Sequence, residues 1–196
     1  MGNGSVRLLD KAYLEENGYN VCYGLGEFNA EVETAEKMVL CQFSAKGKDA
    51  DNYVSDAEYE QNLGLADMLK AGMTFLGDDK PFFFMCEGGR IDWEAHANNL
   101  MPMIKEILDF DRTVGAVLEW AARDGETLVI VTADHSTGGM TLLGGKVAEQ
   151  SVAVNYANTG HNGVALPVYA WGPGAEKFVG IYENAELSQM IKEILK

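Results

Sequence analysis

Short apolar runs alternate along the chain with segments whose apolar residues recur at helical spacing, and this alternation constrains the fold most strongly. Short apolar runs are typical of strands, and runs that no polar residue interrupts are typical of strands buried on both faces. Strands separated by helices predict an α/β fold with a mostly parallel sheet flanked by helices. We expect strands at 19–23, 37–43, 81–86, 127–133 and 166–171. We expect helices at 7–17, 58–76 and 185–195, and one long helix, or a pair broken at Pro102, at 92–123.

Composition and charge exclude several classes of partner and of protein. No internal repeat or linker divides the sequence, so we expect a single domain over residues 1–196. With 15 basic and 30 acidic residues, the net charge of −15 disfavours nucleic acid and anionic lipid as partners. No apolar run is long enough to span a bilayer, and residues 1–10 lack a signal-peptide pattern. An anionic substrate would need local positive charge, which bound cations supply.

The three cysteines, Cys22, Cys41 and Cys86, have no CxxC spacing. A zinc–thiolate site or a disulfide framework is therefore not expected, and buried thiols are the default. Export of the protein would alternatively allow one disulfide between Cys22 and Cys41.

Chemistry-bearing residues follow the expected strand at 81–86. In α/β sheets functional groups gather beyond the carboxyl ends of strands, where Glu87 lies. Asp92 and His96 are four residues apart, so on a helix they share one face and can bind one ion. A carboxylate with an imidazole suits zinc. Taken alone, the segment also fits a surface Glu87, an Asp92 helix cap and a His96 on a polar face.

Two further segments carry the remaining histidines. Asp134 and His135 directly follow the apolar run at 127–133. Burial of these two polar side chains is costly unless they are paired or bind a cation. The glycines at 138–139 permit the turn that would bring both side chains to one ion. A loop with an exposed histidine fits this segment equally well. His161 lies in a glycine-flanked loop, and it is either a plain loop residue or the third ligand that Asp92 and His96 lack.

In order and spacing, these segments resemble the alkaline phosphatase family. The resemblance covers nearly the whole chain and rests on a conjunction of motifs rather than on one. The main motifs are Glu-Gly-Gly-Arg-Ile-Asp at 87–92 with His96, Thr-Ala-Asp-His at 132–135, Thr-Gly-His at 159–161 and Gly-Pro-Gly-Ala at 172–175. Weaker matches lie at 65–68, 81–85 and 184–187.

The resemblance implies a zinc- and magnesium-dependent enzyme that hydrolyses phosphate monoesters. In that family a serine ionised by the second zinc attacks phosphorus to form a phosphoseryl intermediate, and the first zinc stabilises the leaving oxygen and activates water. Family members are usually exported, which implies a periplasmic or secreted protein. The implied ligands are Asp92, His96 and His161 for the first zinc, Asp134 and His135 for the second, and Glu87 for magnesium.

The sequence also departs from the family pattern. The family's nucleophilic serine, bridging aspartate, other magnesium ligands and phosphate-binding arginine precede this region and have no counterpart here. Residues 1–5 resemble a glycine-rich stretch inside the family's domain, so we expect a fragment that is inactive alone. Ser136, beside His135, is not expected to replace the nucleophile. Trp93 stands where other members carry Lys or His, and it either walls the pocket or packs in the core.

Two alternatives follow from these departures. The chain could be a non-catalytic module that binds zinc or assembles with another chain. Missing strands would leave an unpaired sheet edge, which favours homo-oligomers or docking with an amino-terminal half. A related sulfatase or phosphodiesterase is disfavoured, because the run at 87–96 fits alkaline phosphatases in particular.

Overall fold

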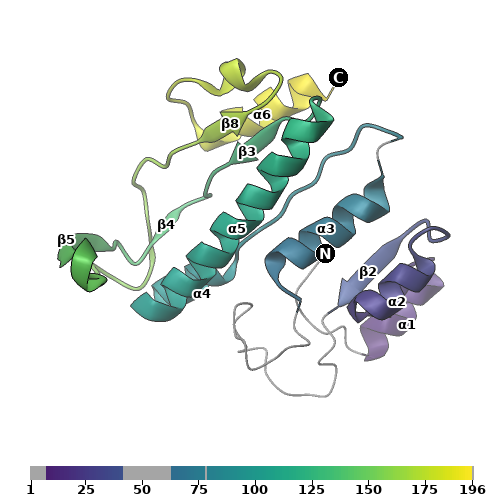
Figure 1. The fold of residues 1–196 in the computed structure, drawn as a ribbon, viewed down its shortest axis with the longest axis horizontal. Helices are drawn as coiled ribbons and strands as arrows, with labels where there is room; N and C mark the ends of the chain where they lie inside the picture. The colour runs from purple at the N-terminus through teal and green to yellow at the C-terminus, as the bar shows by residue number, and fades with distance from the viewer. Residues whose placement is uncertain (1–7, 42–62, 78, 196) are drawn as a thin grey trace. The chain divides into compact units, whose positions relative to one another are not determined.

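The computed structural model describes residues 8–41, 63–77 and 79–195. Contacts divide the chain into two compact units. Figure 1 shows the fold coloured by residue number. Unit 1 comprises Met1–Gly88 and Lys105–Thr113, and unit 2 comprises Gly89–Ile104 and Val114–Lys196. The expectation of one domain over 1–196 stays a prediction. Each unit is described by itself below.

Unit 1 begins with a helix and a parallel strand pair that match the expected elements. Helix α1 ends just before Gly18, whose φ of 80° lets the chain reverse after the helix. Strands β1 and β2 pair in parallel, with Val21 opposite Val39, and helix α2 provides the crossover between them. The bounds are α1 Leu8–Glu16, β1 Asn20–Tyr23, α2 Gly24–Glu31 and β2 Met38–Cys41. The expected positions 7, 42 and 43 lie outside the described residues.

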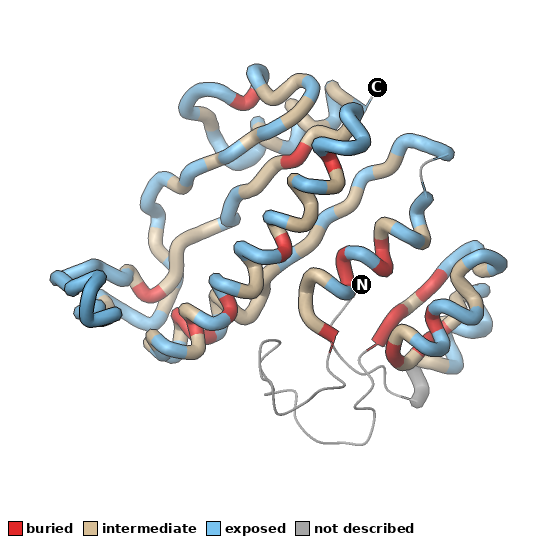
Figure 2. Tube along the Cα trace, viewed as in Figure 1, coloured by how far each residue is buried: buried red, intermediate tan, exposed pale blue. Residues whose placement is uncertain are grey.

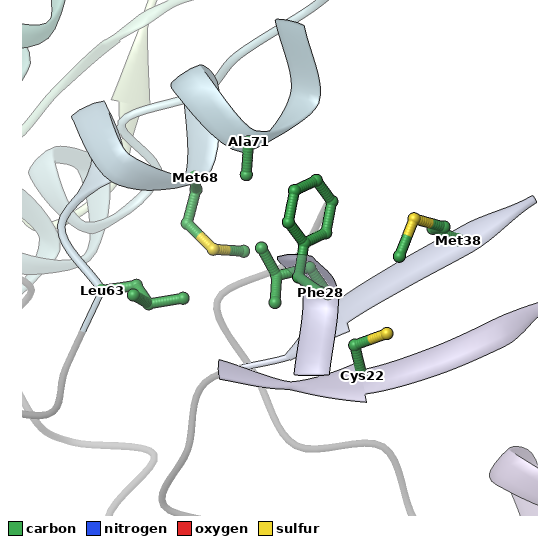
Figure 3. Packing of buried hydrophobic residues seen from close by; sticks show 7 residues of the cluster. Cys22, Phe28, Met38, Leu63, Met68 and Ala71 are labelled. Atoms are coloured by element: carbon green, nitrogen blue, oxygen red, sulfur yellow. The ribbon is translucent and has the colours of Figure 1, made fainter. Parts of the chain in front are cut away.

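The core of unit 1 forms where helix α3 (Leu65–Leu76) packs on this strand pair. The helix begins at Leu65 because the Asp67 carboxylate accepts a hydrogen bond of 3.2 Å from the Gly64 amide. The expected helical positions 58–62 lie outside the described residues. Phe28, 1% exposed, lies at the centre of the buried cluster (Figure 3). Around it are Cys22, Met38, Leu40, Leu63, Met68 and Ala71.

The run at 81–86 is not the strand we expected. It is extended, but no strand among the described residues pairs with it. Its side chains alternate in exposure, with Phe83 60% and Met85 65% exposed, so only one face packs. Phe84 packs directly on α3, where a Cβ at Gly72 would come within 2.5 Å of the Phe84 ring. An apolar run cannot by itself show whether one face or two will be covered.

The expected long helix is a broken pair, but the break is not at Pro102. Helix α4 (Arg90–His96) is seven residues long, and α5 (Leu100–Asp124) follows. Asn98 takes a left-handed φ of 55° between the two helices. Pro102 lies in the first turn of α5, where backbone N–H groups have no partner within the helix, so proline costs little there.

Unit 2 contains three antiparallel strand pairs and the C-terminal helix. The pairs are β3 (Val129–Val131) with β8 (Tyr169–Trp171), β4 (Ser136–Thr137) with β7 (His161–Asn162) and β5 (Thr141–Lys146) with β6 (Ser151–Asn155). Two 3₁₀ turns cover Val147–Glu149 and Ala175–Phe178, and the expected C-terminal helix is α6 (Asn184–Ile194). The expected strands at 127–133 and 166–171 are thus shortened to three residues each.

Helices and strands alternate along the chain, as the α/β class predicts. Among the described residues only β1 and β2 pair in parallel, so the parallel share is smaller than expected. Within unit 2 the hairpin of β5 and β6 projects at one end and α6 lies at the other (Figure 1). The hairpin is exposed along almost its whole length (Figure 2). No helix in the described part of the chain is long and apolar enough to cross a membrane.

The expectation of buried cysteines holds for two of the three. Cys22 and Cys41 are buried and Cys86 is half-buried. In the β1–β2 register Cys22 faces Leu40 and Cys41 faces Tyr23, so the two cysteines are not direct partners. Burial, with the nearby carboxylates of Glu31 and Glu27, raises the pKa of the Cys22 thiol to about 11.

Candidate metal centre

Helix α4 presents Asp92 and His96 on one face, as their spacing predicts. Asp92 Oδ2 lies 3.3 Å from His96 Nε2. The acidic residue is in the first turn and the histidine ends the helix, which suits the helix dipole at both ends. Their side chains are 31% and 38% exposed, so solvent ions can reach them.

His161 reaches the same place from the antiparallel pair of β4 and β7, in which it lies opposite Thr137. His161 Nε2 is 3.0 Å from His96 Nε2 and 3.5 Å from Asp92 Oδ1. Asp92, His96 and His161 each offer one ligand atom within 4.8 Å of the others. Residues 65 positions apart in the chain therefore converge on one point.

The loop before His161 is held against the end of α4. His96 Nδ1 lies 2.5 Å from the carbonyl oxygen of Thr159, to which it donates. The Gly138 amide donates to the Gly160 carbonyl at 2.9 Å, and the Gly138 carbonyl accepts from the Ala157 and Asn158 amides. Gly138 is buried and has a φ of 75°, which confirms the expected glycine turn.

Asp134 and His135 lie beside this group. The chain leaves β3 at Val131 and bends at Asp134, so consecutive side chains no longer diverge as they do in a strand. His135 Nε2 is 3.2 Å from Asp134 Oδ2, and the His135 ring stacks on the His161 ring with centroids 3.5 Å apart. His135 Nδ1 is 3.9 Å from Asp92 Oδ1. The side chain of Asp134 is 81% exposed.

Hydrogen bonding fixes which ring nitrogens face one another. Because His96 donates from Nδ1 to Thr159, a neutral His96 ring has a lone pair on Nε2. That lone pair faces the Asp92 carboxylate and the Nε2 atom of His161. Acceptors held this close repel one another unless a proton or a cation lies between them.

The donor set fits zinc. Tetrahedral zinc with bonds of about 2.0–2.1 Å places its ligand atoms about 3.3 Å apart. The Nε2 atoms of His96 and His161 are 3.0 Å apart, and they lie 3.3 and 3.5 Å from two different oxygens of Asp92. With one ligand atom taken from each residue, the three atoms lie within 4.8 Å of one another. One carboxylate and two imidazoles with a position left open are the ligand set of a catalytic rather than a structural zinc.

All the expected ligands except Glu87 come together in unit 2. Glu87 is exposed, lies in unit 1 just before its first stretch ends at Gly88, and stays a predicted magnesium ligand. The hydroxyl of Ser136 accepts a hydrogen bond of 3.2 Å from the Asn162 side chain across the β4–β7 pair. Trp93 is 59% exposed, which disagrees with the alternative of a core tryptophan, and its ring lies 5.7 Å from the Arg90 guanidinium.

Sequence reasoning missed one residue that contacts two of the expected ligands. Thr137 Oγ1 lies 2.5 Å from Asp92 Oδ1 and 3.1 Å from His135 Nδ1. Its position two residues after His135, on the same side of an extended chain, is a signal that could have identified it.

Comparison with known proteins agrees with the motifs. The family model for alkaline phosphatase matches residues 28–156 and 146–196. Alkaline phosphatase 4 of Bacillus subtilis (strain 168) is 30% identical over 200 residues, covering 67% of this chain and 43% of that protein. The chain spans about half the length of the curated relatives it matches.

Solved structures agree as well. The alkaline phosphatase from the Antarctic bacterium TAB5 matches with a TM-score of 0.77 and 35% identity, covering 96% of this chain and 56% of that chain. A mutant of the TAB5 enzyme, 33% identical with the same TM-score and coverage, was solved with Mg bound in its M3 site. These neighbours confirm the α/β fold class.

Proposed function

Because the chain belongs to the alkaline phosphatase family of hydrolases, we propose that it supplies zinc ligands to a phosphomonoesterase. The observation that carries the proposal is the convergence of Asp92, His96 and His161, whose ligand atoms lie within 4.8 Å of one another. Acceptors directed at one point from a helix and a distant strand repel one another unless a proton or a cation lies between them, and a zinc ion would supply that charge.

In the proposed site, Asp92, His96 and His161 hold the first zinc, and Asp134 and His135 hold the second. Zinc, when bound, stabilises charge on phosphoryl and leaving oxygens and lowers the pKa of bound water. The chain's own residues orient these ligands. Thr159 keeps the His96 proton on Nδ1, so that Nε2 faces Asp92 with a lone pair.

We assign Glu87 to magnesium. Its support is the match of the run at 87–92 to the family motif and the preference of Mg²⁺ for carboxylate oxygen. The magnesium bound in the M3 site of the TAB5 mutant shows that a relative of this chain binds that ion.

These 196 residues contain no counterpart of the family's nucleophile, bridging aspartate or phosphate-binding arginine. We therefore expect the chain by itself to bind zinc without hydrolysing phosphate monoesters, and to need an amino-terminal portion for turnover through a phosphoseryl intermediate. The same residues leave open a zinc-binding or assembly module that never turns over, which includes a homo-oligomer. From the family resemblance we expect the parent protein to be periplasmic or secreted.

Zinc binding and turnover test the proposal separately. We expect the purified chain to retain zinc after desalting at neutral pH, as measured by elemental analysis, and Asp92→Ala to lose it. Asp111→Ala, which removes an exposed acid from α5, is the matched control and should retain zinc. A chain that retains no zinc, or in which both variants behave alike, would contradict the proposed site.

Turnover of p-nitrophenyl phosphate is expected to be at background for the chain alone. Turnover that His96→Ala abolishes would contradict the inactivity of the isolated chain while supporting the metal site. Turnover that appears only when an amino-terminal portion is added would decide between the enzyme and the non-catalytic module.

A further inference from the structure

Thr137 contacts one expected ligand of each proposed ion site. It is half-buried on β4, opposite His161 in the register with β7. Its hydroxyl oxygen is 2.5 Å from Asp92 Oδ1 and 3.1 Å from His135 Nδ1. Asp92 belongs to the first proposed zinc site and His135 to the second, so one hydroxyl contacts a ligand of each.

The hydrogen-bond capacity of the hydroxyl determines its direction. A threonine hydroxyl has one hydrogen to donate and two lone pairs to accept with. An ionised carboxylate can only accept, so the hydrogen is given to Asp92. The lone pairs then face His135 Nδ1, which must carry its proton there, and the Nε2 atom of a neutral His135 ring is left with a lone pair.

We propose that Thr137 is a positioning residue that couples the two zinc sites through its hydroxyl. The hydroxyl fixes the rotation of the Asp92 carboxylate and the tautomer of His135 together. Loss of such an outer partner typically costs 10- to 100-fold in metal affinity. The inference rests on the proposed function, because it takes Asp92 and His135 to be ligands.

The test compares a shape-conserving and a chemistry-conserving substitution in the full chain. Thr137→Val keeps the branched shape but removes the hydroxyl, and Thr137→Ser keeps the hydroxyl. Zinc affinity is measured by competition with a chromogenic chelator. We expect Thr137→Val to weaken zinc binding about 10- to 100-fold and Thr137→Ser to bind close to wild type. Thr141→Val, the same change on exposed β5, is the control and should bind like wild type.

Denaturation of the zinc-free proteins separates positioning from a purely structural role. Without zinc, Thr137→Val should unfold at nearly the same urea concentration as Thr137→Ser. The two variants should differ in zinc affinity. Equal zinc affinity in wild type and Thr137→Val, with Asp92→Ala weakened, would overturn the role of Thr137 and leave the proposed zinc site standing. Absence of zinc binding by the wild type would overturn both.

The tautomer of His135 gives a readout that requires no variant of Thr137 to fold. Long-range ¹H–¹⁵N correlation spectra of the zinc-free wild-type chain should show the His135 proton on Nδ1. A proton found on Nε2 instead would show that the Thr137 hydroxyl does not orient the ring, and would overturn the inference even if Thr137→Val is unstable.

Discussion

Replacement of Gly138 by alanine should perturb the turn after His135. The Gly138 amide in that turn is hydrogen-bonded to the Gly160 carbonyl just before His161. Gly138 has a φ of 75°, and a Cβ there would lie 2.9 Å from the Ala95 carbonyl oxygen and 3.0 Å from Tyr156 Cδ1. The left-handed conformation costs an L-residue roughly 1–2 kcal/mol, and forcing a methyl group into a packed site costs about 1–3 kcal/mol. The reduced entropy of the unfolded chain offsets about 0.4–1 kcal/mol. We expect a net loss of about 1–4.5 kcal/mol in the free energy of unfolding.

Gly160 provides the matched control in the partner loop. Its φ lies outside the left-handed region, and a Cβ there would have nothing within 4 Å. Gly160→Ala should therefore stabilise the protein by about 0.4–1 kcal/mol through the unfolded state, opposite in sign to Gly138→Ala.

Urea denaturation in EDTA, followed by tryptophan fluorescence, measures this difference, because the three tryptophans all lie in unit 2. Since the new methyl group pushes on the Ala95 carbonyl at the end of α4, Gly138→Ala should also weaken zinc binding, whereas Gly160→Ala should not. Equal stability of the two variants would refute the reasoning from backbone geometry.

Three further predictions concern stability. Phe28→Ala should lower the free energy of unfolding by about 3–5 kcal/mol, because Phe28 is 1% exposed in the core of unit 1. Urea denaturation followed by far-UV circular dichroism measures this loss. Tyr13→Ala, at a side chain that is 67% exposed, is the control and should have little effect. Gly115→Ala, in the middle of α5 with open space around a new Cβ, should raise stability by about 1 kcal/mol, and a loss of stability on urea denaturation would contradict its placement. Because the folded pKa of Cys22 is raised from 9.0 to about 11, the neutral thiol contributes stability below pH 9 that is lost as the pH rises through 11. The stability advantage of wild type over Cys22→Ala, measured by urea titration, should therefore shrink between pH 9 and 11; a constant difference would contradict the raised pKa.

Local sequence signals identified most elements because the chemistry that starts and stops them is local. Gly18 ends α1, and the apolar spacing of α3 is satisfied by one packed face. The failures needed non-local information. The run at 81–86 has the composition of a buried strand, but pairing depends on which strands lie beside it. Pro102 looked like a break because its place in the first turn of α5 could not be known before the helix start was known.

Most of the candidate site could be assembled from motifs, because its expected ligands lie on one short helix or soon after an apolar run. The spacing of Asp92 and His96 on α4 fixes their shared face, which the 3.3 Å separation confirms. The approach of His161 depends instead on the β4–β7 pair, which no spacing rule predicts. The contact of Thr137 with Asp92 is likewise non-local, since the two residues are 45 positions apart, and only its spacing from His135 is a local signal.

The hairpin of β5 and β6 connects the segments that carry the expected ligands. Asp134 and His135 precede the hairpin in the chain, and His161 follows it. The β4–β7 pair and the Gly138–Gly160 hydrogen bond join the two chain segments where the hairpin begins and ends. The spacing of the expected ligands therefore does not depend on the turn between β5 and β6. Doubling the length of a flexible loop costs only about 0.6 kcal/mol. The 147–150 tip is therefore a natural point at which this scaffold can gain or lose sequence, and a place to splice in a reporter peptide without rebuilding the metal-binding end.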